Sequence, residues 1–239
     1  MKIGALQSAY LPWLGFFDQI NQCDLFIIYD DLQYTSKDWR NRNRIKTANG
    51  PLWLAVPVLR SGLGPRRINQ VEICYQENWR RRHLKSIQMS YRKAPFFSAD
   101  EAFFQWVYEQ EFRLLATLNR TIVDHCLARL GITTRVLYSS EACIEVDFLA
   151  GHKPVDATKR IVYLCERFGA QIFLEGSRGR NYINQEMLRD AGIILEYHDY
   201  PHPIYRQLYG EFIPYLSIID LLFNEGANSL SILSKGGLK

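Results

Sequence analysis

Short apolar runs and helical patterns alternate at both ends of the chain. Five runs are bounded by polar residues and predict buried strands at 3–7, 24–29, 134–138, 171–174 and 193–197. Apolar side chains at helical spacing predict helices between and after them, at 13–22, 156–168, 182–191 and 215–224. Strands that alternate with helices pair in parallel through right-handed crossovers. The pattern therefore predicts an α/β fold with a mostly parallel, doubly wound (Rossmann-like) sheet.

The middle of the chain interrupts this alternation. We expect a long polar and basic loop over 30–49, followed by two strands at 52–59 and 68–75. Two helical patterns follow at 78–91 and 99–130, and we expect the second to be broken once. No repeat, low-complexity segment or linker divides the sequence. We therefore predict one α/β domain over 1–239, in which 30–130 form a helical and hairpin insertion or lid. The Gly- and Ser-rich tail is expected to be frayed.

The ends of the predicted strands are the places to look for chemistry. In open α/β sheets, ligands bind beyond the carboxyl ends of the strands. The polar and aromatic side chains that follow the first four of these strands are Gln7, Tyr10, Trp13, Asp30, Asp31, Gln33, Ser139, Ser177 and Arg178. We expect them to converge on one rim of the sheet.

Asp30 and Asp31 are the candidates for acid–base chemistry. They directly follow the second predicted strand. Neighbouring side chains of a strand point to opposite faces, so we expect only one of them to face the pocket. That carboxylate could act as a general base or a metal ligand. The alternative is that it caps a helix or turn.

The turn after the fourth predicted strand has the composition of an anion site. Gly176 and Gly179 permit close approach of the backbone, and Ser177 is a candidate cap for the helix that follows. Arg178 and Arg180 can bind phosphate or carboxylate through their guanidinium groups. Many strand-to-helix turns share this composition without binding a ligand, so both interpretations stay open.

A second basic segment lies in the predicted loop. On an extended chain, Arg40, Arg42 and Arg44 would share one face, while Asn41 and Asn43 would share the other. The arginines could bind a polyanion while the amides recognise hydroxyl groups. Together with a basic helical pattern at 79–93, the segment could bind RNA. We favour a basic pocket lip for a nucleotide-linked substrate, because the net charge of the chain is only +4.

Composition and missing motifs narrow the partners further. The five cysteines and five histidines show no metal-ligand spacing, so we predict no metal site. Neither the dinucleotide-binding nor the P-loop glycine motif occurs, and the sequence identifies no cofactor. It also gives no indication of oligomeric state. The chain has no signal-peptide pattern and no apolar run of the roughly 20 residues that span a bilayer, so we expect a cytoplasmic protein.

Several motifs resemble the WbqC-like protein family, and the likeness covers nearly the whole chain. The most specific stretch is the first 46 residues, with Gln7-x-x-Tyr10-Leu11-Pro12-Trp13-x-Gly15-x-Phe17, Asp30-Asp31-x-Gln33 and Asn41-Arg42-Asn43-Arg44-Ile45-Lys46. Further matches include Trp53-Leu54-x-Val56-Pro57, Ser139-Ser140-Glu141, Arg160, Gly176, Tyr182, Gln207 and Ser217 to Asn224. One departure is Ser8, where we expect the family to have proline, and this affects only the local turn.

The resemblance implies a place in O-antigen and related surface-polysaccharide gene clusters, and a role in transferring glycine or another acyl group to an amino sugar. We therefore hypothesise a transferase that acts on the amine of a nucleotide-linked amino sugar. In that hypothesis Asp30 or Asp31 is the base. Gln7, Asn41 and Asn43 recognise polar groups of the substrate. Arg42, Arg44 and Arg178 bind its phosphates. A base or sugar stacks on Tyr10 and Trp13. The alternatives are a non-catalytic scaffold of polysaccharide assembly and an RNA-binding module.

Overall fold

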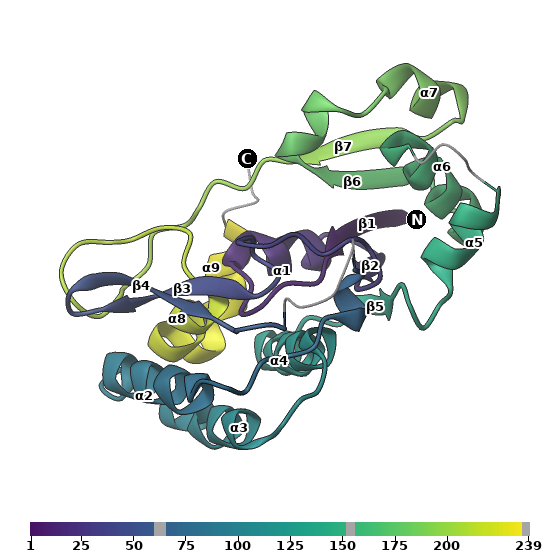
Figure 1. Cartoon of the computed structure of the whole chain (residues 1–239). Helices are drawn as coiled ribbons and strands as arrows, with labels where there is room; N and C mark the ends of the chain where they lie inside the picture. Colours follow the sequence, from purple (N-terminus) through teal and green to yellow (C-terminus); the bar gives the residue numbers. More distant parts are fainter. Residues whose placement is uncertain (60–65, 152–155, 236–239) are drawn as a thin grey trace.

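The computed structural model describes residues 1–59, 66–151 and 156–235 (Figure 1). Its strands are β1 (Lys2–Gln7), β2 (Leu25–Tyr29), β3 (Arg42–Thr47), β4 (Gly50–Ala55), β5 (Arg135–Tyr138), β6 (Ile172–Gly176) and β7 (Ile194–His198). Its α-helices are α1 (Leu14–Asn21), α2 (Trp79–Tyr91), α3 (Ser98–Glu109), α4 (Leu115–Leu130), α5 (Ile144–Gly151), α6 (Ala157–Phe168), α7 (Gln185–Asp190), α8 (Ile218–Glu225) and α9 (Ser229–Lys235). Short 3-10 helices are η1 (Ile68–Gln70), η2 (Ser177–Asn181) and η3 (Gly226–Asn228).

A five-stranded parallel sheet organises the molecule, in the order β5-β2-β1-β6-β7. The prediction of an α/β fold with a parallel, doubly wound sheet is therefore confirmed. The chain first builds outward from β1 to β2 and β5, and then returns to the other side of β1 with β6 and β7. The strand order thus reverses between β1 and β6, which is where open α/β sheets bind their ligands.

Helices cover both faces of this sheet, because its strands carry apolar side chains on both sides. In β2, Phe26 and Ile28 pack into a core shared with α1, α4 and α8, while Leu25, Ile27 and Tyr29 pack into a second core shared with α6 and α7. We call these the α4 face and the α6 face of the sheet. The alternation places Gln7 on the α6 face with Ile3, and Glu175 on the same face with Phe173.

The hairpin in the middle of the chain differs from the expected one. The segment 42–47, expected as loop, is strand β3 and pairs antiparallel with β4 around Gly50, whose φ is +99°. The strand expected at 68–75 is instead the 3-10 helix η1 followed by isolated bridges at Glu72 and Ile73. One face of the hairpin packs on the α4-face core through Ile45 and Leu54, which fixes its register.

The helices follow the expected pattern except at α5, a helix that the sequence pattern did not predict, and at the end of the chain. The long helical pattern is broken into α3 and α4 as expected. The tail, expected to be frayed, forms α9, because Leu233 packs fully buried in the core and α9 contacts α1; the last four residues lie outside the described ranges. No helix of the described ranges combines the length and apolar character needed to cross a membrane.

Candidate functional site

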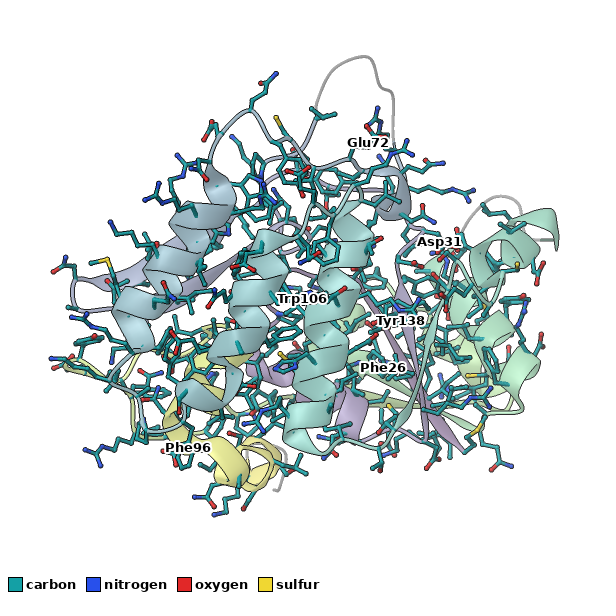
Figure 2. All side chains as sticks on the ribbon, turned by 90° about the horizontal axis from the view of Figure 1, so that it is seen from below. Phe26, Asp31, Glu72, Phe96, Trp106 and Tyr138 are labelled. Carbon is teal, nitrogen blue, oxygen red and sulfur yellow. The ribbon has the colours of Figure 1, made fainter. Side chains whose placement is uncertain are left out.

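The carboxyl ends of the parallel strands bring several predicted residues to one edge of the sheet. Gln7 closes β1 and lies beside Tyr29, the last residue of β2, in the strand register. Asp30 and Asp31 follow immediately, and Ser139 follows β5, the next strand outward. Figure 2 shows Asp31 farther along the sheet than Phe26 and Tyr138, toward the end where the strands finish. The first two strands are parallel, as the hypothesis of a common rim required.

Asp30 is held by the two serines that follow β5. The hydroxyl of Ser140 donates to Asp30 Oδ2 at 2.6 Å, and the backbone N–H of Ser140 donates to Asp30 Oδ1 at 2.9 Å. Ser139 Oγ lies 3.1 Å from Asp30 Oδ1 and also donates to Asp31 Oδ1. Both oxygens of Asp30 are therefore engaged in joining β2 to β5. This arrangement favours the capping interpretation for Asp30 and a structural role for Ser139, which is fully buried.

Asp31 differs from Asp30 in having a carboxylate oxygen without a partner. Its Oδ2 is buried and makes no hydrogen bond in the part of the chain that the structure describes. Burial raises the pKa of the Asp31 carboxyl, and the charges of Asp30 and Glu145 raise it further, against a hydrogen bond from Ser139 that lowers it. A buried, unpaired polar group costs free energy unless a ligand or solvent satisfies it.

Two neighbouring groups on the α6 face share this property. Gln7 Oε1 and Tyr29 Oη are both buried and unpartnered among the described residues. The pKa of Tyr29 is raised, first by burial and then by the charges of Glu145 and Asp31, against the opposing charge of Arg160. We call Gln7, Tyr29 and Asp31 the open polar cluster. Three unpartnered atoms from two adjacent strand ends are what a site prepared for a polar ligand would have.

An ion pair borders the open polar cluster. Arg160 of α6 donates to both oxygens of Glu145 of α5, at 2.8 and 2.9 Å, and its guanidinium lies 5.8 Å from the centre of the Tyr29 ring. The Glu145 side chain is almost fully buried, so the pair is shielded from water. In the sequence, Arg160 appears only among the residues that resemble the family. The structure assigns it to the wall of the site.

Glu175 is the acid–base group that sequence reasoning missed. It lies one residue before the end of β6, across the point where the strand order reverses from β1. Burial raises the pKa of its carboxyl to about 7, against hydrogen bonds from Tyr182 Oη and the Gly176 N–H that lower it. A carboxyl group with a pKa near neutrality can take up and release a proton under physiological conditions.

Gly179 is what lets the turn η2 close over this carboxyl. A Cβ atom added at Gly179 would lie 2.3 Å from Glu175 Cγ, which is far inside van der Waals contact. The sequence contains Glu175 at the end of a strand, and that position was the available signal. Nothing in the sequence indicated that the turn would bury it.

The predicted anion-binding residues lie on the walls around this edge. Arg178 of η2 is exposed, and its charge reaches Asp38 in the loop before β3. Burial raises the pKa of Asp38, but hydrogen bonds from Trp39 N–H and Thr35 and the charges of Arg40 and Arg178 outweigh burial and lower it. Arg42 and Arg44 lie on the solvent face of the hairpin, against the Trp53 ring. The same loop thus lies between the β6 end and the hairpin arginines and contacts or interacts with both.

Several predicted contact residues do not face the rim. Tyr10 is fully buried and bonds to His83 Nδ1 and Tyr108 Oη, so it cannot stack on a ligand. Asn43 is buried and donates to Leu11 O, because it holds the turn after β1. Gln33 is exposed and bridges to Arg67 in the adjacent strand-like segment. Tyr10 and Asn43 therefore serve the fold, whereas the role of the exposed Gln33 side chain stays a prediction.

The remaining candidates are placed as follows. Trp13 is half-buried among Tyr200 and Tyr215. Asn41 donates to Val56 O while its Oδ1 is buried and unpartnered among the described residues. Ser177 is exposed but makes no capping hydrogen bond, because Gly176 occupies the cap position of η2. The predicted helix N-terminus at this turn is therefore a short 3-10 helix.

The basic helix α2 is partly neutralised by contacts inside the protein. Arg80 donates to the last carbonyls of α3 and to Glu111 at 2.9 Å, and Arg82 pairs with Glu77 at 2.5 Å. Both guanidinium groups therefore have local anionic partners. The RNA-binding alternative loses two of the cations on which it depended.

Comparison with known proteins identifies the family. The fold and site define a Rossmann-like α/β protein with polar groups gathered where the strand order reverses. The model of the WbqC-like protein family matches residues 7–232. The chain belongs to the WbqC-like protein family.

The curated relative extends the match to almost the full length. "Uncharacterized protein Rv1507c" of Mycobacterium tuberculosis (strain ATCC 25618 / H37Rv) is 36% identical to this chain over 230 residues, which are 95% of each chain. No solved structure matches the chain significantly. The open polar cluster and Glu175 all lie within the region that the family model covers.

Proposed function

We propose that the protein is a cytoplasmic transferase of surface-polysaccharide biosynthesis that acylates the amine of a nucleotide-linked amino sugar. Family membership supports the general setting. The proposal is carried by the open polar cluster at the ends of β1 and β2, together with Glu175 near the end of β6 across the reversal of strand order. A polar, hydroxyl- and amine-bearing ligand supplies the partners that Gln7, Tyr29 and Asp31 lack.

The proposed reaction assigns a role to each group. The sugar amine attacks the carbonyl carbon of an activated acyl donor, a new C–N bond forms, and the bond to the leaving group breaks. Glu175, with a pKa of about 7, accepts the proton that the amine loses. Asp31 and Gln7 orient the amine and the sugar hydroxyls through their free oxygens. The Tyr29 hydroxyl donates to the oxygen that gains negative charge.

The charged groups around the cluster fit a phosphorylated substrate. Arg178 lies at the end of β6, and Arg42 and Arg44 lie beyond the loop on the hairpin. Guanidinium groups bind phosphate oxygens through paired N–H donors. We assign the carboxylate Asp31 to the amine end of the substrate and these arginines to its phosphate end.

A binding and turnover experiment tests the proposal. UDP-, dTDP- and GDP-linked amino sugars are screened by thermal shift, and bound compounds are then assayed with acyl-CoA or with ATP and glycine by mass spectrometry. We expect one substrate class to raise the melting temperature and to be acylated. Gln7→Ala should abolish the shift in melting temperature, and Glu175→Gln should keep binding and lose turnover. Gln105→Ala, at an exposed position of α3, should behave as wild type. If no nucleotide-linked amino sugar binds, the proposal is wrong.

A further inference from the structure

The solvent face of the β3–β4 hairpin has an unusual composition. One face carries the buried Asn43, Ile45 and Leu54. The other presents Arg42, Arg44 and Trp53 to solvent and is buried only at Lys46. Arg44 and Trp53 are direct partners in the strand register. Trp53 is 45% exposed, and Trp39 of the preceding loop, 39% exposed, lies beside it. Two large rings at the surface next to two guanidinium groups need an explanation, because solvent-facing strand positions are normally polar.

The rings and cations form one continuous surface. The ring centres of Trp39 and Trp53 are 5.6 Å apart at an interplanar angle of 34°. The guanidinium carbons of Arg42 and Arg44 lie 4.5 and 5.5 Å from the Trp53 ring centre. Such contacts are typical of cation–π interactions, which orient the guanidinium groups over the ring. We call these four residues the tryptophan–arginine patch.

The loop that carries Trp39 is fixed to the core by its backbone. The N–H of Tyr10 donates to Trp39 O at 3.0 Å, and Asn119 Nδ2 donates to Arg40 O at 2.9 Å. The N–H of Trp39 in turn donates to Asp38 Oδ1 at 2.7 Å. The exposed ring therefore stands on an ordered backbone, and a ligand that stacks on it finds the surface already formed.

The arginines keep N–H groups for an anion. Within the described part of the chain, Arg42 Nη2 donates to Lys37 O and Arg44 Nη2 donates to Tyr215 O at 3.4 Å. A guanidinium carries five N–H donors, of which the one on Nε is buried in both arginines, so the Nη donors not used in these contacts are left for a ligand. Diphosphate oxygens satisfy such donors in pairs.

We propose that the tryptophan–arginine patch binds the nucleoside diphosphate half of the substrate, with the base on Trp39 and Trp53 and the diphosphate on Arg42 and Arg44. This inference rests on the proposed function, which places the amino sugar in the open polar cluster. A neutral oligosaccharide would stack on the tryptophans but has no charge for two guanidinium groups. Stacking on exposed rings and charge on adjacent cations are together what a nucleoside diphosphate offers.

The position of the patch fits a substrate that spans two subsites. Figure 1 shows the hairpin on the side of the sheet toward which β1 runs from the N-terminus. Arg42 donates a hydrogen bond to Lys37 O. The next residue is Asp38, whose pKa is lowered in part by the charge of Arg178, just after β6. The loop at 37–41 thus joins the patch to the sheet edge. A nucleotide bound on the hairpin directs its sugar across this loop toward Glu175.

Titration of free nucleoside diphosphates tests the inference directly. UDP, GDP and dTDP are titrated into the full chain, with affinity measured by calorimetry and by quenching of tryptophan fluorescence. We expect one of them to bind and Trp53→Leu and Trp39→Leu each to weaken it about 10-fold, since base–aromatic stacking is lost. Trp106→Leu is the matched control, because Trp106 is also an exposed tryptophan (47%) but lies on α3 (Figure 2), where its ring contacts Phe103 and Phe112.

Variants of the two arginines separate the contribution of charge to nucleotide binding from that of stacking. Arg42→Gln and Arg44→Gln should each weaken the diphosphate about 10-fold or more and leave the affinity of the free nucleoside unchanged. Arg113→Gln, with an exposed guanidinium paired to Glu72 in a different region, should have no effect. Inorganic pyrophosphate should compete, whereas chitobiose, a neutral disaccharide, should not. Competition by chitobiose alone would mean that the patch binds glycan.

The outcomes distinguish this inference from the proposed function. If a nucleotide-linked amino sugar binds and depends on Gln7 but not on Trp39 or Trp53, the patch assignment is wrong and the proposed function stands. If nucleoside diphosphates bind to the patch but no amino sugar adds affinity, the patch assignment stands and the proposed function fails. If no nucleoside diphosphate binds the wild-type chain, the patch assignment is overturned.

Discussion

Two buried polar regions of this protein are built in opposite ways. Beneath the hairpin, Asp220 of α8 accepts hydrogen bonds from Tyr91 at 2.8 Å and from Tyr205 at 2.7 Å. Lys46 donates to Gln207 Oε1 and to Glu211 O, and its backbone N–H donates to Tyr91 Oη. Each polar side chain in this region has a partner. We call it the closed network.

At the strand ends the opposite holds. Gln7, Tyr29 and Asp31 each keep a buried polar atom without a partner in the described ranges. A fully satisfied network specifies one packing arrangement, whereas a partly satisfied one costs stability unless something else completes it. The difference teaches that burial of polar groups alone does not mark a site. The feature that points to a ligand is a group of unpartnered polar atoms at the ends of neighbouring strands.

The largest expected effect is loss of the closed network. Asp220→Ala leaves the hydroxyls of Tyr91 and Tyr205 without their acceptor in a site with no exposure to solvent. We expect the free energy of unfolding to fall by about 3–5 kcal/mol, because two buried hydroxyls each lose their acceptor at a cost of about 1–3 kcal/mol apiece. Chemical denaturation measures this change. Asp190→Ala, at an exposed position of α7, is the control and should change stability by less than about 0.5 kcal/mol.

A pH experiment on Glu175 gives the next largest effect. The folded state raises the pKa of this carboxyl from its ordinary 4.5 to about 7, so the folded protein binds the proton more tightly than the unfolded chain. The stability contributed by the protonated form is present at low pH and is lost as the pH rises from about 4.5 to 7. Glu175→Gln stays uncharged, so it should exceed wild-type stability by on the order of 2 kcal/mol above pH 7. Below pH 4.5 the wild type and Glu175→Gln should have nearly equal stability, and denaturation curves at pH 4, 6 and 8 measure the trend.

The same variant checks the role of Glu175 in turnover. In the wild type, the rate of acyl transfer should rise with an apparent pKa near 7, because only the carboxylate accepts a proton. A variant with full activity and the same pH profile would remove Glu175 from the reaction.

The sequence predicts the fold far better than it predicts this contrast. The run Leu25 to Tyr29 is apolar throughout and is buried throughout, so the parallel sheet could be recognised from its pattern. Strand β3 could not, because Arg42, Asn43 and Arg44 carry no apolar alternation. Its place against the sheet involves the side chain of Asn43, which donates to Leu11 O, 32 residues away. Local pattern does not encode such a contact.

The candidate site was predictable in position but not in detail. The rule for strand ends located Gln7 and Asp31 correctly at the rim of the sheet. It could not tell Asp31 from Asp30, because the serines that occupy Asp30 lie 109 and 110 residues away in sequence. Tyr10 looked like a surface ring in sequence, yet its partner Tyr108 lies 98 residues away. Whether a polar atom has a partner is a property of the tertiary structure.

A pair of glycine substitutions tests how tightly the site is shaped. At Gly179 a Cβ atom would meet Glu175 Cγ at 2.3 Å and Ile183 Cδ1 at 2.9 Å, whereas at Gly176 it would meet nothing within 4 Å. Gly179→Ala should cost about 1–3 kcal/mol of stability, as overpacking does. It should also push the Glu175 carboxyl toward solvent and shift the pH profile of transfer to lower pH. Gly176→Ala should leave stability and profile unchanged within about 0.5 kcal/mol. Equal effects at both positions would show that the turn is not fitted to Glu175.

The smallest effect is the sharpest test, because the two regions should respond with opposite signs to the same chemical change. Tyr91→Phe removes a hydroxyl that donates to Asp220 and accepts from the Lys46 N–H, and we expect it to cost about 1–2 kcal/mol. Tyr29→Phe removes a buried hydroxyl that has no partner among the described residues, so stability should stay the same or rise by up to about 1 kcal/mol. Denaturation of both variants measures the stabilities, and calorimetry with the bound amino sugar nucleotide measures affinity. The closed-network variant should bind as wild type does, while Tyr29→Phe should bind more weakly. If Tyr29→Phe is as unstable as Tyr91→Phe, its hydroxyl serves the fold, and the open polar cluster loses the feature that distinguishes it from the closed network.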